Sequence, residues 1–99
     1  MNITTRKDGE TLIIELEGRL DTVTSQELAA NVPHEMRNNL NIIFDFAKLE
    51  YISSAGLRIL IAFKKDAQAT NNTMIIKNCN AVIKEIFHVT GFDKILKIE

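Results

Sequence analysis

The sequence is poor in cysteine, histidine and proline, and it has no tryptophan. Its single cysteine, Cys79, cannot form an internal disulfide, which excludes the small secreted domains that depend on disulfides for stability. The two histidines, His34 and His88, provide no cluster of ligands at the spacing of a metal site. A protein of a reducing compartment, without a bound metal ion, is therefore the simpler expectation.

Long apolar runs and an excess of one charge are also missing. No apolar run approaches the roughly eighteen residues of a membrane span, and the N-terminus lacks the apolar segment of a signal peptide. Lysine and arginine number 12 against 13 acidic residues, and no block of like charge occurs. Neither nucleic acid nor an anionic membrane is an expected partner, and we expect a cytoplasmic protein.

Sequence signatures of catalysis are absent as well. Ser54 lies in Ser-Ser-Ala-Gly, whereas the nucleophile elbow of hydrolases requires glycine at the position of Ile52. The four glycines are too scattered for a phosphate-binding loop: Gly9, Gly18, Gly56 and Gly91. We expect no enzymatic activity and no cofactor, and a small serine-dependent enzyme is the least favoured function.

What the sequence does contain is the composition of one globular domain. Hydrophobic residues make up 45% and charged residues 25% of the 99 residues, which is ordinary for a folded soluble chain. No linker, repeat or low-complexity segment divides it. A single domain spanning residues 1–99 follows.

The most informative stretch runs from residue 42 to residue 60. Residues 42–46 are β-branched and aromatic, which predicts a parallel strand buried on both faces that stops at Ala47-Lys48. Ser53 and Ser54 then precede a helix over residues 55–69, whose apolar side includes Leu57, Leu60 and Ile61. A serine at a helix N-terminus either caps the helix only or accepts a phosphate that the free N–H groups favour.

Two strands and a helix are predicted before this stretch. Residues 3–6 and 11–17 read as strands around an Asp8-Gly9 turn, and Gly18 ends the second strand. A loop over residues 21–23 follows, and Thr24 with Glu27 forms the capping-box pattern that opens a helix. Leu28 and Val32 form its buried side, and Pro33 kinks or ends it.

The remaining elements complete an α/β domain. They are a strand over residues 73–77, a helix over residues 81–89 that Gly91 stops, and a last strand over residues 95–98. The order β-β-α-β-α-β-α-β predicts a mostly parallel central sheet of about five strands, with an antiparallel N-terminal edge hairpin and three main helices.

Asp45 is placed by this scheme at the carboxyl end of a buried strand. That edge of an open α/β sheet is where ligands and partners usually bind. A charge there must be paired or near solvent. A binding role and a structural role, in which the carboxylate caps neighbouring N–H groups, are equally compatible with the sequence.

Three motifs in order resemble the STAS domain family, which comprises bacterial anti-sigma factor antagonists and the cytoplasmic tails of sulphate transporters. The first is Asp45 followed nine positions later by Ser54-Ala55-Gly56-Leu57, with Tyr51-Ile52 in front. The others are Gly18-Arg19-Leu20-Asp21-Thr22 and Val89-Thr90-Gly91-Phe92. Together they span nearly the whole chain, so the resemblance implies a single STAS-like domain.

The resemblance implies a partner switch. In anti-sigma factor antagonists the unphosphorylated domain binds an anti-sigma factor, often a GHKL-type serine kinase, and so releases a sigma factor; phosphorylation reverses this and a serine phosphatase restores it. Ser54 matches the phosphoacceptor and Ser53 the residue before it. The helix start that meets the partner corresponds to Ala55, Gly56 and Leu57, and the site is flanked by Asp21, Thr22 and Asp45.

Two departures leave an alternative open. Phosphorylated family members usually have aspartate where Ser53 stands, and Ala55 replaces a common serine or threonine. Ser53 therefore also leaves the identity of the acceptor open. The alternative is a constitutive, unphosphorylated STAS interaction module in another signalling or transporter-associated complex. A monomer is expected for a surface so small and nearly neutral.

Overall fold

A five-stranded sheet in the order β1-β2-β3-β4-β5 forms the centre of the structure, a computed structural model that describes residues 1–99. β1 and β2 are antiparallel and all other neighbours are parallel, as the sequence predicted. The elements in chain order are β1 (Asn2–Asp8), β2 (Thr11–Leu20), α1 (Thr22–Asn31), α2 (His34–Arg37), β3 (Asn41–Ile52), α3 (Ser54–Ala69), β4 (Met74–Lys77), α4 (Ala81–Thr90), the 3-10 turn η1 (Phe92–Lys94) and β5 (Lys97–Ile98).

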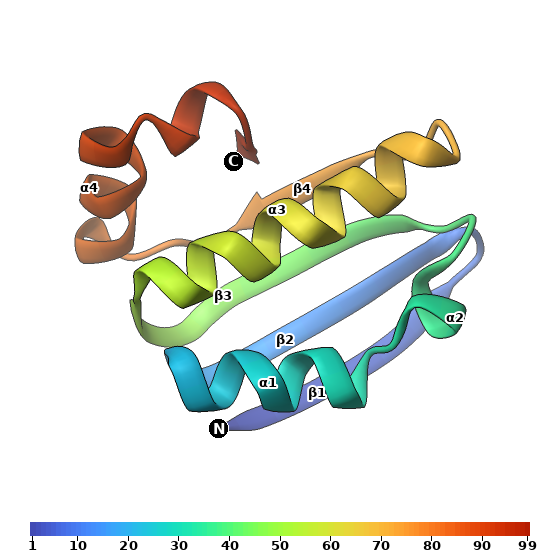
Figure 1. Ribbon diagram of the computed structural model, residues 1–99, viewed down its shortest axis with the longest axis horizontal. Helices are drawn as coiled ribbons and strands as arrows, with labels where there is room; N and C mark the ends of the chain where they lie inside the picture. The colour runs from blue at the N-terminus through green and yellow to red at the C-terminus, as the bar shows by residue number, and fades with distance from the viewer.

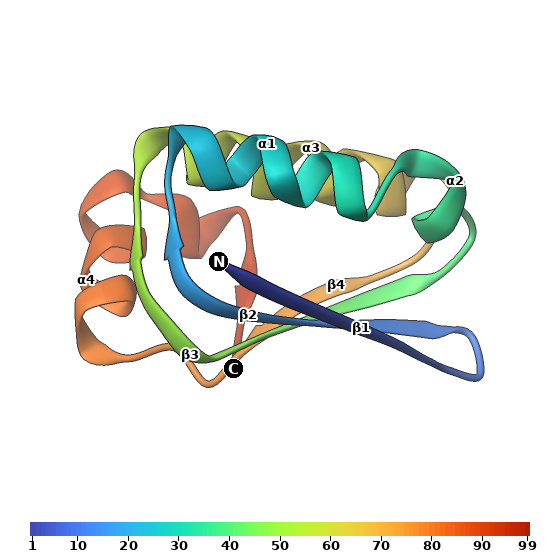
Figure 2. The ribbon, with the colours of Figure 1, turned by 90° about the horizontal axis from the view of Figure 1, so that it is seen from below.

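The helices cover one face of the sheet and leave the other open. Figure 2 shows α1, α2 and α3 above the strands, with α4 beside the bent ends of β2 and β3. Side chains facing the helices, such as Ile14 and Phe44, are fully buried, whereas Ile13 and Ile43 on the other face are only half-buried. The prediction that the central strand is buried on both faces was therefore wrong, because no helix crosses to the second face.

β3 continues to Ile52 and does not stop at Ala47-Lys48. In its pairing with β2, Glu15 lies opposite Asp45 but Glu17 lies opposite Lys48. A second such step follows between Leu49 and Tyr51, so β3 has two β-bulges, which bend a strand. The buried positions change their spacing with the bulges, from alternate residues up to Phe46 to every third residue at Leu49 and Ile52. The exposed pair Ala47-Lys48 thus marks a bulge and not the end of the strand.

β2 also extends further than predicted. Gly18, at a φ of 110°, lies within the strand, which ends at Leu20. Only glycine adopts this conformation without strain, and it falls where β3 bends. The two strands therefore curve together toward the helical side (Figure 2).

The N-cap of the first helix lies three residues before the predicted one. Asp21 is its N-cap, and the capping box is formed by Asp21 with Thr24 instead of Thr24 with Glu27. Leu28 and Val32 are buried as predicted, and the helix ends at Asn31, just before Pro33. Gly91 ends α4 in the left-handed conformation, also as predicted, whereas η1 shortens the last strand to two residues.

A single apolar cluster joins the sheet to the helices. Its largest members are fully buried aromatic rings, with Phe44 stacked at tilted angles against Phe46 and Phe63 at centroid distances of 5.8 and 5.3 Å. Leu57, Leu60 and Phe63 fix α3 on the sheet. None of the helices is both long enough and apolar enough to span a membrane.

Candidate functional site

The turn from β3 into α3 lies beside the turn from β2 into α1 (Figure 1). Leu20 and Ile52, the last residues of the two strands, are paired. The Ser53 N–H donates a hydrogen bond of 2.9 Å to the carbonyl oxygen of Leu20. The residues that follow, Asp21 on one side and Ser54 on the other, are thereby held at one end of the sheet.

The two serines of this turn have different environments. Ser53 is half-buried and is the N-cap of α3, where its Oγ accepts a hydrogen bond of 3.4 Å from the Gly56 N–H. Ser54 is exposed, and its hydroxyl bonds to no other group of the protein. Of the two serines that the sequence offered as caps, Ser53 caps the helix and Ser54 faces solvent.

Gly56 allows α3 to approach the strand ends closely. A Cβ atom at this position would lie 2.6 Å from Cγ1 of Ile52 and 2.8 Å from the carbonyl oxygen of Leu20. These separations are too short for any side chain without movement of the backbone. The absence of a side chain at Gly56 therefore sets how Ser54 is presented.

Leu57 is buried, at 6% exposure, and Gly56 is buried too, while Ala55 is half-buried. In the free chain Gly56 and Leu57 anchor the turn and leave the exposed surface to Ser54 and its neighbours. Arg58, which the sequence did not single out, is exposed one turn after Ser54. The spacing of four residues on a helix could have identified it.

Asp21 is used as a helix cap. Its Oδ1 accepts hydrogen bonds from the N–H groups of Thr24 and Val23, at 3.0 and 3.1 Å. These hydrogen bonds hold the pKa of the Asp21 carboxyl below its usual value, and the bond from Thr24 has the largest effect. Asp21 is therefore a negative charge next to the Ser54 turn. Thr22, the first residue of α1, is exposed beside it.

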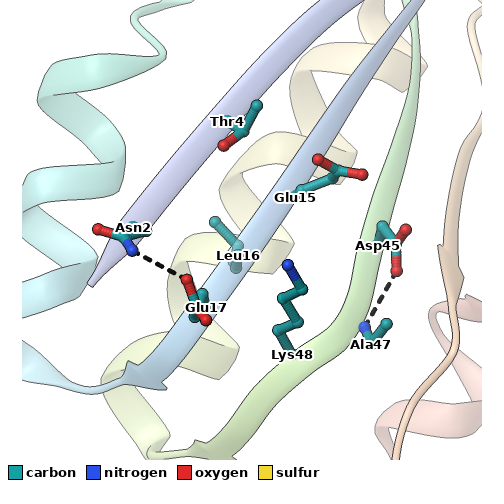
Figure 3. A pocket seen from close by; sticks show the side chains of 8 residues that line it. All are labelled: Asn2, Thr4, Glu15, Leu16, Glu17, Asp45, Ala47 and Lys48. Carbon is teal, nitrogen blue, oxygen red and sulfur yellow. Dashed lines mark hydrogen bonds between the residues drawn. The ribbon is translucent and has the colours of Figure 1, made fainter.

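Asp45 does not lie at this end of the sheet. It is in the middle of β3, seven residues before the last residue Ile52, which corresponds to roughly 23 Å of strand. Figure 3 shows its side chain on the open face, where it lines a shallow pocket of about 90 Å³ with Thr4, Glu15 and Lys48 among others. The prediction that Asp45 marks the carboxyl end of the strand was wrong, because the bulges carry the strand past it.

The Asp45 carboxylate has a structural role in the turn after β4. Its Oδ1 accepts hydrogen bonds of 3.0 Å from the Asn78 side-chain amide and from the Ala47 N–H. The pKa of Asp45 is lowered, chiefly by the hydrogen bond from the Asn78 amide. The Ala47 N–H and the charges of Arg6 and Lys48 lower it further, and partial burial opposes them with a smaller effect. The carboxylate thus ties the first bulge of β3 to the start of the β4–α4 connection.

This geometry gives a prediction for acid stability. A carboxyl whose pKa is lower in the folded chain stabilises it above the unfolded pKa of about 3.9, and that contribution disappears as the pH falls through the folded value. We expect Asp45→Asn to flatten the decline in unfolding free energy below about pH 4, measured by urea denaturation at a series of pH values. Asp8→Asn, at an exposed aspartate whose side chain has no hydrogen bond or ion pair, is the control. If the unfolding free energy of Asp45→Asn declined below pH 4 as steeply as that of the parent, the prediction would be contradicted.

The histidines and the cysteine lie away from the Ser54 turn. His34 contacts Asp66 at 3.4 Å and His88 contacts Asp93 at 3.1 Å. Cys79 is buried, and burial raises the pKa of its thiol to about 11, so it is protonated at neutral pH. No group of three or more His, Cys, Asp or Glu side chains is arranged to hold a metal ion.

Comparisons with known proteins agree with this architecture. The model of the STAS domain family matches residues 2–99. The chain belongs to the STAS domain family. A protein of Bordetella bronchiseptica named as an anti-sigma factor antagonist, BtrV, is 25% identical over 99 residues, covering 99% of this chain and 85% of its own.

Solved structures show that this STAS domain shares its fold with proteins of different names. The anti-sigma factor antagonist SpoIIAA superposes with a TM-score of 0.74 in its unphosphorylated form, at 18% identity and covering 99% of this chain and 87% of its own. The phosphorylated form of SpoIIAA, from Bacillus, gives 0.75 at 19% identity, covering 99% and 91%. A sulfate transporter family protein of Wolinella succinogenes gives 0.78 at 13% identity, covering 92% and 77%.

Proposed function

We propose that this STAS domain is an anti-sigma factor antagonist, which binds an anti-sigma factor in a manner switched off by phosphorylation of Ser54. One observation carries the proposal: Ser54 is exposed at the first turn of α3 with an unbonded hydroxyl, while Ser53 is occupied as the cap. The name of BtrV and the existence of a phosphorylated form of SpoIIAA support it.

The chemistry of the turn suits a phosphate on Ser54. The N–H groups of Ser54 and Ala55 have no carbonyl partner within the helix, because α3 begins at Ser54. These donors and the helix dipole stabilise negative charge at this end. A serine kinase would transfer the γ-phosphoryl group of ATP to Ser54 Oγ, with ADP leaving and the hydroxyl proton released to a base of the kinase.

The proposed partner surface surrounds Ser54 at this end of the sheet. It comprises Ser54, Ala55 and the exposed Thr22, with Asp21 at its border and Ser53, Gly56 and Leu57 supporting it from below. The partner is an anti-sigma factor of the GHKL serine kinase type, and a serine phosphatase reverses the modification. Asp45 contributes to the shape of the domain and lies outside this surface.

A second candidate is a constitutive STAS interaction module in a signalling or transporter-associated complex. Ser53, where phosphorylated members of the family usually have aspartate, favours it. The shared fold of the Wolinella succinogenes sulfate transporter family protein is compatible with it. Such a module would use the same exposed turn without modification.

Mass spectrometry of the protein purified from its native cells distinguishes the two. We expect one phosphate, located on Ser54 by phosphopeptide analysis, and its loss in a Ser54→Ala variant. Ser53→Ala serves as the matched control and should keep the phosphate. If no phosphate is found under any growth condition, the switch is excluded and the constitutive module is favoured.

A further inference from the structure

Arg58 is an exposed cation with no partner in the folded chain. It forms no ion pair, hydrogen bond or aromatic contact. Two of the other three arginines are engaged: the Arg19 guanidinium lies 4.6 Å from the Tyr51 ring centroid, and Arg37 pairs with Asp66 at 2.6 Å. Arg58 is therefore available for an anion that the unmodified protein lacks.

The position of Arg58 on α3 brings it to Ser54. Residues four apart on a helix are neighbours on one face, with Cβ atoms about 5–6 Å apart. Long helical side chains lean toward the N-terminus and cover the preceding turn. An anion at the earlier position and a cation at the later one is also the more favourable order for such a pair. From this position an extended Arg58 side chain can bring its guanidinium beside the Ser54 hydroxyl.

We propose that Arg58 binds the phosphate of phosphorylated Ser54 and so takes part in the switch within the same helix turn. The inference rests on the proposed function of Ser54. Arginine suits this role because its guanidinium donates paired hydrogen bonds that match phosphate oxygens. The helix N-terminus would attract an anion weakly, whereas Arg58 adds a full opposite charge.

This pairing changes what phosphorylation does to the surface. Unphosphorylated, the turn presents a free guanidinium that an acidic group of the partner can bind. A phosphate adds a charge of about −1.5 to −2 at neutral pH and also occupies that guanidinium. The partner therefore loses a cationic contact at the same time as it meets a new anion.

A phosphate titration tests the pairing without a kinase or a partner. The protein is made with phosphoserine encoded at position 54, and the second pKa of its phosphate is measured by ³¹P NMR at an ionic strength of about 0.1 M, where the Debye length is about 10 Å. A nearby cation stabilises the dianion and lowers this pKa below its usual value of about 6. We expect Arg58→Gln to raise it by about 0.5 unit, and Arg58→Lys to give an intermediate value.

Lys65→Gln is the matched control. Lys65 is exposed on the same helix and carries the same charge, but lies about 16 Å from Ser54 along the helix axis. Its replacement should shift the phosphate pKa by less than about 0.1 unit, because salt screens charges at that separation. Equal shifts in Arg58→Gln and Lys65→Gln would overturn the pairing. Absence of phosphate in native cells would instead overturn the proposed function, since the titration uses encoded phosphoserine.

Discussion

Ser54→Asp is expected to weaken binding of the anti-sigma factor by about 100-fold or more while the domain stays cooperatively folded. Ser54 is exposed and bonded to nothing, so a carboxylate there disturbs no internal contact, and the helix dipole partly stabilises it. In the complex, however, the interface would bury this carboxylate, and the acidic group of the partner would lose the Arg58 guanidinium to it. An unpaired buried charge costs about 3–5 kcal/mol, and 100-fold corresponds to about 2.7 kcal/mol.

Ser54→Asn separates charge from size in this experiment. Asparagine has nearly the same shape as aspartate and no charge, so it should retain most of the affinity in isothermal titration calorimetry with the purified kinase. Urea denaturation of both variants checks that they are folded. Equal losses in Ser54→Asn and Ser54→Asp would mean that crowding, not charge, controls the interface, and an unchanged affinity in Ser54→Asp would exclude the switch.

Gly56→Ala is expected to lower the unfolding free energy by about 1–3 kcal/mol, the usual effect of adding a methyl group to a packed site. Helix propensity alone predicts the opposite, since alanine is favoured over glycine by about 1 kcal/mol within a helix. The contacts decide the sign. The new Cβ would lie 2.8 Å from the Leu20 carbonyl oxygen, and that oxygen cannot retreat without losing its bond to the Ser53 N–H.

The measurement is the denaturation midpoint and slope in urea, with Ser54→Ala as the control. Ser54→Ala replaces an exposed, unbonded hydroxyl in the same turn, so its stability should stay within about 0.5 kcal/mol of the parent. If Gly56→Ala were as stable as the parent or more stable, the turn would have room to move. The position of Ser54 would then not be fixed by this contact.

The sequence predicted the fold well where one physical rule decided the outcome. The alternation of apolar residues, the positions of glycine and proline, and the order of the elements predicted the sheet and its antiparallel first pair. They also predicted that the first and last main helices end near Pro33 and Gly91. The prediction failed at Ala47-Lys48, because a β-bulge exposes two successive residues without ending a strand. The changed spacing of Phe46, Leu49 and Ile52 was the only sign of the bulges, and it becomes readable only when the register with β2 is known.

The geometry of the candidate site could be predicted from the sequence only in part. The motif located the serine turn, but Ser53 and Ser54 are chemically identical, and only the geometry of the helix start assigns one to the cap and the other to solvent. Asp45 was misplaced because the length of its strand was misjudged. Arg58 was passed over because its significance depends on Ser54 being free, which the residue pattern alone did not establish.

The two bulges also make the segment between Asp45 and Ser54 a spacer of fixed length. Leu49 and Ile52 enter the core only if each bulge supplies one residue beyond the count of β2. Losing or gaining a single residue there would rotate the following side chains to the wrong face. Changes in chain length can be absorbed in the exposed turn at Gly9, but not in the segment that carries the serine to its place.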